Sequence, residues 1–238
     1  MKRLIILLLA ISMLLTVVAC VENRTSPEGE NGGQPDDTAQ TSDTGAQSGV
    51  PAGFVEYHNA AEGFTIHYPP GWHLFDETFS EEDIELMMDE AQGLGLSGVM
   101  DDLGIDFNSV LVYWFDFNNA TDAFIPNINL TLADSSGMTQ EDLGQQTYIT
   151  MLQEFFESMY ATIFEEFTVI ENLTGAIHGG NQYAVFKFGV NLGGVDASFC
   201  QAITIVDGEM YTFTLTTRSD LFGATVPLFE NMLASLTF

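Results

Sequence analysis

The sequence predicts an α+β fold in which helices cover an antiparallel β-sheet. Three observations lead to this prediction. The last third of the chain alternates apolar and polar residues in four strand-like segments separated by short turns. Two pairs of strand-like segments precede them, and three other segments show the apolar spacing of a helix. Because strands and helices come in separate runs, the pattern indicates an α+β sandwich.

The N-terminus has the features of an export signal. Lys2 and Arg3 precede an apolar stretch from Leu4 to Val18, which is short for a helix that spans a bilayer. The stretch ends in VVAC, which resembles the lipobox of bacterial lipoproteins and implies cleavage between Ala19 and Cys20. The alternative is an ordinary signal peptide with a chance cysteine. We expect a diacylglycerol on Cys20 to anchor the mature chain to the extracytoplasmic face of the cell membrane.

The composition changes after the anchor. Between Val21 and Ala52 the chain consists mainly of Gly, Ser, Thr, Asn, Gln, Pro, Asp and Glu, which bury too little apolar surface to fold. Residues 1–19 are therefore expected to be the signal peptide, and residues 20–52 the lipidated cysteine and a disordered acidic and polar linker. Residues 53–238 are rich in aromatic and aliphatic side chains and are long enough for one domain.

Periodicity and turn residues place the elements of this domain. Thr139 is the expected N-cap of the long helix, and Pro227 is expected in the first turn of the last helix. Asp207 and Gly208 predict a two-residue hairpin in which both residues have positive φ. In chain order the expected elements are strands 54–58 and 64–68, helix 81–92, strands 110–117 and 128–133, helix 139–163, strands 167–177, 182–191, 197–206 and 210–217, and helix 225–235.

A motif near the start of the domain resembles a known family. Residues Gly63 to Trp72 read GFTIHYPPGW and are similar to the opening of PsbP-like domains, a superfamily that includes the bacterial DcrB lipoproteins. The strand meander and the closing segment from Phe229 to Phe238 are similar as well. Physically, the two prolines stop the strand, the glycine turns the chain, and Trp72 packs against the sheet. The resemblance implies a PsbP-like α-β-α sandwich and, because the motif is structural, no active site.

The charge of the chain limits its partners. It has 34 acidic and 5 basic residues, a formal net charge of −29, and after Gly53 only Lys187 and Arg218 are basic. Nucleic-acid binding starts from a basic surface, so we exclude it. Anionic headgroups would repel the domain, so contact with the membrane must come from the lipid on Cys20. An envelope protein or a small-molecule ligand remains open as a partner.

No enzyme motif stands out. Residues 93–98 match a G-x-G-x-x-G dinucleotide fingerprint, but they follow an acidic helix rather than a strand, so a helix end and turn is favoured. Cys200 lies in an apolar strand and is expected to be a buried, inert thiol. We therefore expect no catalytic residue, no cofactor and no metal site. Four histidines lie outside known metal-binding motifs and are expected at partly buried or surface positions: His58, His67, His73 and His178.

Carboxylates offer the main alternative. Asp116, Asn118, Asn119 and Asp122 place oxygen ligands on one expected loop, and residues 101, 102 and 106 are further aspartates. Neither set has the spacing of an EF-hand, so a solvated acidic face is favoured. The function we predict is that of a membrane-anchored extracytoplasmic lipoprotein, a non-catalytic binding or accessory module of the cell envelope. A divalent-cation-binding lipoprotein is the alternative, and an enzyme comes third.

Overall fold

The computed structural model describes residues 50–76, 110–121, 124–164, 166–192 and 194–238. The expected signal, Ala19 and Cys20, most of the linker, the expected helix 81–92 and the glycines of residues 93–98 lie outside the described residues.

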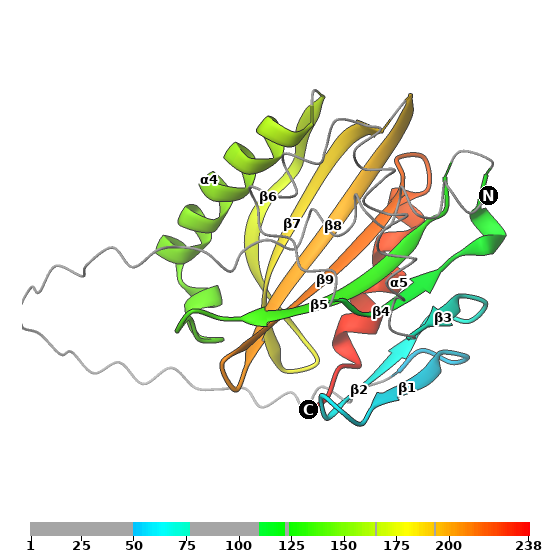
Figure 1. The fold of residues 1–238 in the computed structure, drawn as a ribbon, viewed down its shortest axis with the longest axis horizontal. Helices are drawn as coiled ribbons and strands as arrows, with labels where there is room; N and C mark the ends of the chain where they lie inside the picture. Colours follow the sequence, from blue (N-terminus) through cyan, green and yellow to red (C-terminus); the bar gives the residue numbers. More distant parts are fainter. Residues whose placement is uncertain (1–49, 77–109, 122–123, 165, 193) are drawn as a thin grey trace, which may run out of the picture.

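A seven-stranded antiparallel sheet forms the centre of the domain (Figure 1). Its strand order is β3-β4-β5-β9-β8-β7-β6, and every neighbouring pair is antiparallel. A separate two-stranded hairpin, β1 (Val55–Asn59) with β2 (Phe64–Tyr68), precedes it. The strands of the main sheet are β3 (His73–Phe75), β4 (Val110–Phe115), β5 (Asn127–Asp134), β6 (Phe167–His178), β7 (Asn181–Leu192), β8 (Val195–Val206) and β9 (Glu209–Arg218).

Helices cover the two faces of the sheet. Helix α4 (Gln146–Ile163) lies along β6 on one face, and α5 (Phe222–Ala234) packs on the opposite face, with the β1–β2 hairpin beside it (Figure 1). Each face has its own apolar core, because successive strand residues point to opposite sides. In β8, for example, Phe199 belongs to the α4 core and Cys200 to the α5 core. The α+β fold class predicted from the sequence is confirmed.

The buried position expected for Cys200 is confirmed as well. Its side chain is fully buried, and burial raises the pKa of the thiol to about 12. Since the thiolate is the reactive form, this cysteine is inert at neutral pH. No helix among the described residues is long and apolar enough to cross a membrane.

The meander agrees closely with the prediction. The hairpin between β8 and β9 has φ values of 52° at Asp207 and 88° at Gly208, as the expected turn requires. Three details differ. β3 was not expected. Pro227 lies inside α5 rather than in its first turn, because the helix already begins at Phe222. Helix α4 begins at Gln146 rather than at Thr139.

The later start of α4 has a local cause. The backbone N–H and the hydroxyl of Thr139 both donate to Asp142 Oδ2, at 2.9 and 2.8 Å, so Thr139 does not cap the helix. A short 3-10 helix, η3 (Asp142–Gly144), follows, and Gln145 is extended before α4 begins. From the apolar spacing of this segment alone, Tyr148 and Phe155 are expected on the buried face of α4, but the observed buried face is rotated away from them. The buried residues of α4 are Ile149, Leu152, Phe156, Met159 and Tyr160.

The motif at Gly63–Trp72 has the structural role expected of it. Gly71 takes a φ of 81°, and the Trp72 backbone N–H donates to the Pro69 carbonyl at 3.4 Å, so the chain turns sharply after β2. Trp72 is 8% exposed and belongs to the core beneath α5. The motif therefore positions one large buried side chain.

Replacing Trp72 with Ala should lower the free energy of unfolding by roughly 3–5 kcal/mol, because truncating a buried tryptophan leaves a cavity. Chemical denaturation monitored by circular dichroism measures the change. Ile177→Ala is a suitable control, since Ile177 is 72% exposed and its truncation should change the free energy by less than about 0.5 kcal/mol. Equal losses in the two variants would show that Trp72 does not pack as described.

Candidate functional site

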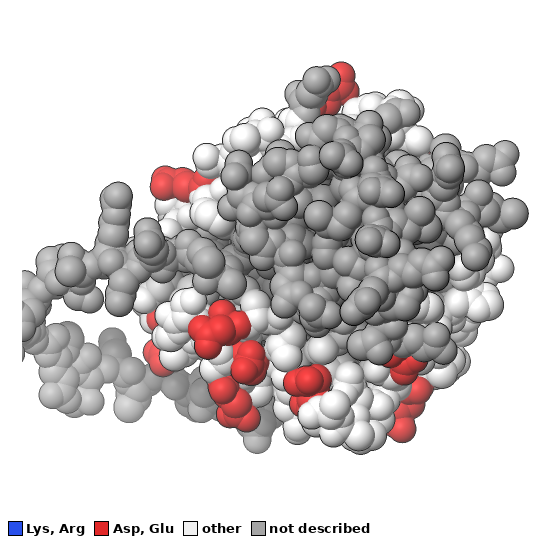
Figure 2. Space-filling model, in the orientation of Figure 1, with Lys and Arg blue, Asp and Glu red and all other residues white. Residues whose placement is uncertain are grey.

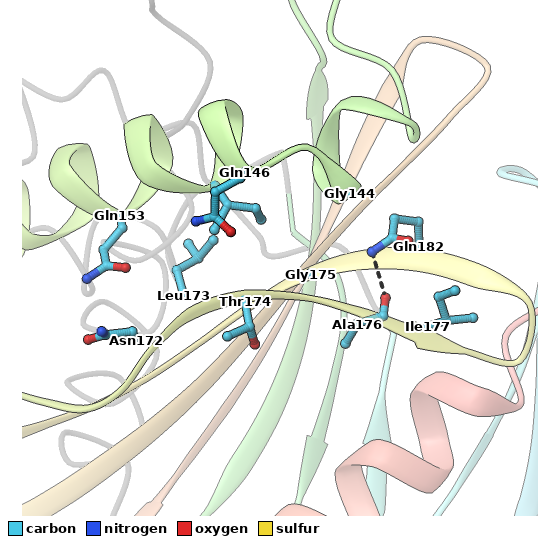
Figure 3. A pocket seen from close by; sticks show the side chains of 11 residues that line it. Gly144, Gln146, Gln153, Asn172, Leu173, Thr174, Gly175, Ala176, Ile177 and Gln182 are labelled. Atoms are coloured by element: carbon cyan, nitrogen blue, oxygen red, sulfur yellow. Dashed lines mark hydrogen bonds between the residues drawn. The ribbon is translucent and has the colours of Figure 1, made fainter. Parts of the chain in front are cut away.

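An open groove of about 590 Å³ lies between the start of α4 and the edge strand β6 (Figure 3). Its volume falls within the range of about 300–1,000 Å³ that is typical of ligand pockets. Figure 3 shows Gln146 and Gln153 reaching from α4 toward β6, with Asn172 and Leu173 on the strand below. The lining residues are Gly144, Gln146, Ile149, Gln153, Asn172, Leu173, Thr174, Gly175, Ala176, Ile177 and Gln182.

Close backbone packing fixes one end of this groove. A Cβ atom on Gly175 would lie 3.1 Å from the Leu143 carbonyl oxygen, so glycine lets η3 rest directly on β6. The register of β6 against β7 shifts on either side of Glu171, which marks irregularities in the edge strand just before the groove. The groove thus follows from how η3 and α4 approach a bulged edge strand.

The groove is polar but uncharged. None of its 11 lining residues is acidic or basic. Gln182 is held in place, because its Nε2 donates to the Ala176 and Tyr183 carbonyls at 3.1 and 3.3 Å. Gln153 Nε2 donates to Glu157 Oε1 at 2.7 Å, and the carbonyl oxygen of the same amide can accept a hydrogen bond. Such a lining can form hydrogen bonds to a ligand, and none of its side chains is a nucleophile paired with a base.

The charged surface of the domain is mainly acidic. In the space-filling view of Figure 2, the charged side chains visible among the described residues are Asp and Glu. The two basic side chains of the domain are already paired: Lys187 Nζ lies 2.8 Å from Glu171 Oε2, and Arg218 donates to Asp220. Neither is available as a free cation for an anionic partner. A partner that docks here is therefore favoured when it is neutral or basic.

The histidines singled out from the sequence do not form a site. His58 hydrogen-bonds Thr65, His67 lies 3.6 Å from Glu56, and His178 packs edge-on against a tyrosine ring. His73 contacts the ring of Phe117. All are exposed or half-buried, as predicted. Among the described residues, no three His, Cys, Asp or Glu side chains are close enough to hold a metal ion.

In the acidic loop considered as a cation site, the carboxylate of Asp116 stabilises the local backbone. Asp116 is 7% exposed and caps a short 3-10 helix, η2 (Phe117–Asn119). Its Oδ1 accepts from the backbone N–H groups of Asn118 and Asn119, and its Oδ2 accepts from Asn119 Nδ2 at 2.7 Å. Asp122 lies outside the described residues, as do the aspartates at 101, 102 and 106. The carboxylate of Asp116 therefore acts as a cap.

The groove residues form no motif in the sequence. They come from η3, α4, β6 and β7, and in each element they resemble ordinary surface residues. One signal was present: Asn172, Thr174 and Gly175 interrupt the apolar alternation of the strand predicted at 167–177.

Replacing Asp116 with Ala should lower the free energy of unfolding by about 0.5–2 kcal/mol, as expected for the loss of an N-cap. The loss should be the same with or without millimolar calcium in 0.15 M sodium chloride. Thermal unfolding of the wild type and the variant in both buffers tests this. A calcium-dependent rise in melting temperature that the variant lacks would contradict the capping role and favour a cation site.

Comparisons with known proteins found similar solved structures but no matching sequence family. No protein-family model matches the chain, and no curated protein matches it. A cyanobacterial PsbP from Synechocystis sp. PCC 6803 is 16% identical, with a TM-score of 0.44 over 82% of this chain and 98% of that one. LpqN of Mycobacterium tuberculosis, involved in cell envelope biogenesis, is 11% identical, with a TM-score of 0.47 over 77% and 89%. The Ran-binding protein Mog1p of Saccharomyces cerevisiae is 8% identical, with a TM-score of 0.40 over 77% and 94%. A PsbP is thus among the structures that the chain resembles, and at these identities no residue's role carries over from them.

Proposed function

We propose that this protein is an extracytoplasmic lipoprotein that acts as a non-catalytic binding module, and that the groove between α4 and β6 is where it binds a partner. The observation that carries this proposal is the open, uncharged groove with hydrogen-bonding amides on one wall and an edge strand on the other. An edge strand offers unpaired backbone groups to an extended chain, and the amides add specific contacts.

The expected anchor and linker fit this role. A diacylglycerol on Cys20 supplies the two acyl chains that stable attachment to a bilayer requires. A linker of the composition found between Val21 and Ala52 would span typically about 30 Å, which would be enough to hold the groove clear of the headgroups. The domain would then be able to meet partners over a range of orientations while remaining at the membrane.

The surface charge favours one kind of partner. The groove itself is uncharged, and the two basic side chains of the domain are paired with carboxylates. A neutral or basic protein segment of the envelope meets these conditions, whereas a nucleic acid or an anionic lipid headgroup does not.

Site-specific photo-crosslinking in intact cells tests the groove. A photoreactive amino acid at Ile177, which is 72% exposed at the groove, should give a defined adduct. The same amino acid at Val55, 42% exposed on β1, is the matched control and should give none. Gln146→Ala with Gln153→Ala should weaken the Ile177 adduct several-fold. No adduct at Ile177, or the same adducts at both positions, would contradict the groove as the binding site.

The anchor has its own test. Replacing Cys20 with Ser should move the protein from the membrane fraction into the medium or a soluble export fraction, because no thiol remains to carry the lipid. Cys200→Ser is the control and should leave the protein in the membrane fraction, since that thiol is buried. Membrane retention of the Cys20→Ser protein would show that another anchor exists.

A further inference from the structure

The edge of β6 beside the groove is regular only after a β-bulge. β6 is the last strand in the order of the sheet, so no strand among the described residues pairs with its outer edge. Asn172 and Leu173 together lie opposite a single residue of β7, which marks the bulge. After the bulge, each residue from Thr174 to His178 pairs with one residue of β7. A further strand can therefore add to residues 174–178, and the bulge limits how far it continues.

The side chains of this edge alternate between the two faces of the sheet. Leu173 belongs to the core beneath α4, whereas Ala176 packs against the core beneath α5. A Cβ atom on Gly175 would meet the Leu143 carbonyl of η3, and Ile177 lines the groove. Residues 173, 175 and 177 thus share the α4 face. A strand added to this edge would likewise present every second side chain to the groove.

The two ends of the groove differ in chemistry. Figure 3 shows Gln153 of α4 above Asn172 of β6 at one end, and Ile177 at the other. Ile177 is 72% exposed, so its end offers an apolar side chain to a partner. The opposite end has an amide group from each element. A partner that fills the groove therefore meets an apolar contact at one end and hydrogen-bonding groups at the other.

A carboxylate adjoins the amide end. Glu157 lies one helical turn after Gln153 on α4, and its Oε1 accepts from Gln153 Nε2 at 2.7 Å. Both side chains are half-buried. The amide oxygen of Gln153 and the carboxylate of Glu157 can each accept a further hydrogen bond. We call these two side chains the Gln153–Glu157 pair.

The charge of Glu157 has no counter-charge within the part of the chain that the structure describes. The two basic residues of that part are paired elsewhere, Lys187 with Glu171 and Arg218 with Asp220. A hydrogen bond between a cationic donor and a carboxylate is roughly twice as strong as one between neutral groups. The Gln153–Glu157 pair, with two acceptors and one negative charge, is therefore suited to an ammonium or guanidinium group.

From this arrangement we infer that the groove binds an extended segment that carries a lysine or arginine four residues from an apolar residue. The segment adds to the edge of β6 at residues 174–178. Its apolar side chain packs against Ile177, and its basic side chain donates to the Gln153–Glu157 pair. This inference rests on the proposed role of the groove and specifies the chemistry of the partner.

The spacing of four residues follows from the geometry of the strand. Leu173 is next to Asn172 at the amide end, and Ile177 is at the apolar end. These two positions are four residues apart on the α4 face, about 13 Å at roughly 3.3 Å per residue. A partner strand has the same rise, and only its alternate side chains face the groove. Its apolar and basic side chains must therefore be separated by the same even number of residues.

Photo-crosslinking in intact cells, followed by mass spectrometry of the captured peptide, tests the inference. The probe is p-benzoylphenylalanine at position 177 of the full-length protein. The captured segment should carry a lysine or arginine four residues from the crosslinked residue. A captured segment without a basic residue at about that spacing would overturn the inference and leave the groove as a binding site. No adduct at all would overturn both the role of the groove and the inference.

A charge substitution provides the second test. Glu157→Gln removes the charge and keeps the side-chain size, so it should lower the yield of the adduct at position 177 by about threefold to tenfold. Glu154→Gln makes the same change at an exposed position of α4 and should leave the yield unchanged. Both purified variants should melt within about 2 °C of the wild type, so that the yield reports binding. An unchanged yield with Glu157→Gln, or equal losses in the two variants, would overturn the inference.

Discussion

The pairing of β5 with β9 is the interaction on which the rest of the structure depends. It joins residues 127–134 to residues 209–216, far apart in the chain, in an unbroken antiparallel register. Without the β5–β9 pairing, β3, β4 and β5 would form a small sheet separate from the β6–β9 meander. Such distant contacts form only after a large loss of chain entropy, so the side chains that stabilise them must supply the compensating free energy. The two cores, which both include residues from β5 or β9 and their neighbours, do so.

The register of β5 on β9 also determines which side chains lie on each face of the sheet. A slip of one residue would turn every side chain of β5 to the opposite face. In the observed register, Ile128 and Leu130 meet Leu215 and Phe213 beneath α5, and the asparagines of β5 lie on the α4 face. The middle of the sheet and its β6 edge therefore differ in their side chains and exposure. The middle holds buried amide and hydroxyl groups, whereas the β6 edge has a groove at the surface.

The meander could be predicted from the sequence because its signals are local. Alternating residues and the Asp207-Gly208 turn place the four strands β6 to β9 to within two residues of their observed ends. The predicted start of α4 was wrong because Thr139 donates its hydrogen bonds to Asp142, and this contact forms only in the folded turn. β3 was missed because its three residues are too few to show a period. The expected signal, Cys20 and the helix at 81–92 lie outside the described residues and stay predictions.

The groove and the buried polar face of β5 could not be predicted in the same way. In β5, Asn127, Asn129 and Thr131 alternate with apolar residues, which is the pattern of a strand with one face in water. Only the burial of the polar face in the folded protein makes this pattern unusual. The groove residues come from four elements, so no single segment carries their signal. In both cases the information lies in which residues the tertiary structure brings together. The excess of acidic residues, by contrast, is plain from the sequence, and it led us to expect no anionic partner.

A high-resolution crystal structure of the protein is the most direct test of the central claim, that the β5–β9 register determines which side chains face each core. We predict Ile128 opposite Leu215 and Leu130 opposite Phe213 in the core beneath α5, with Asn127 and Asn129 on the α4 face. A register shifted by one residue, which would turn Asn127 and Asn129 toward α5, would contradict the claim.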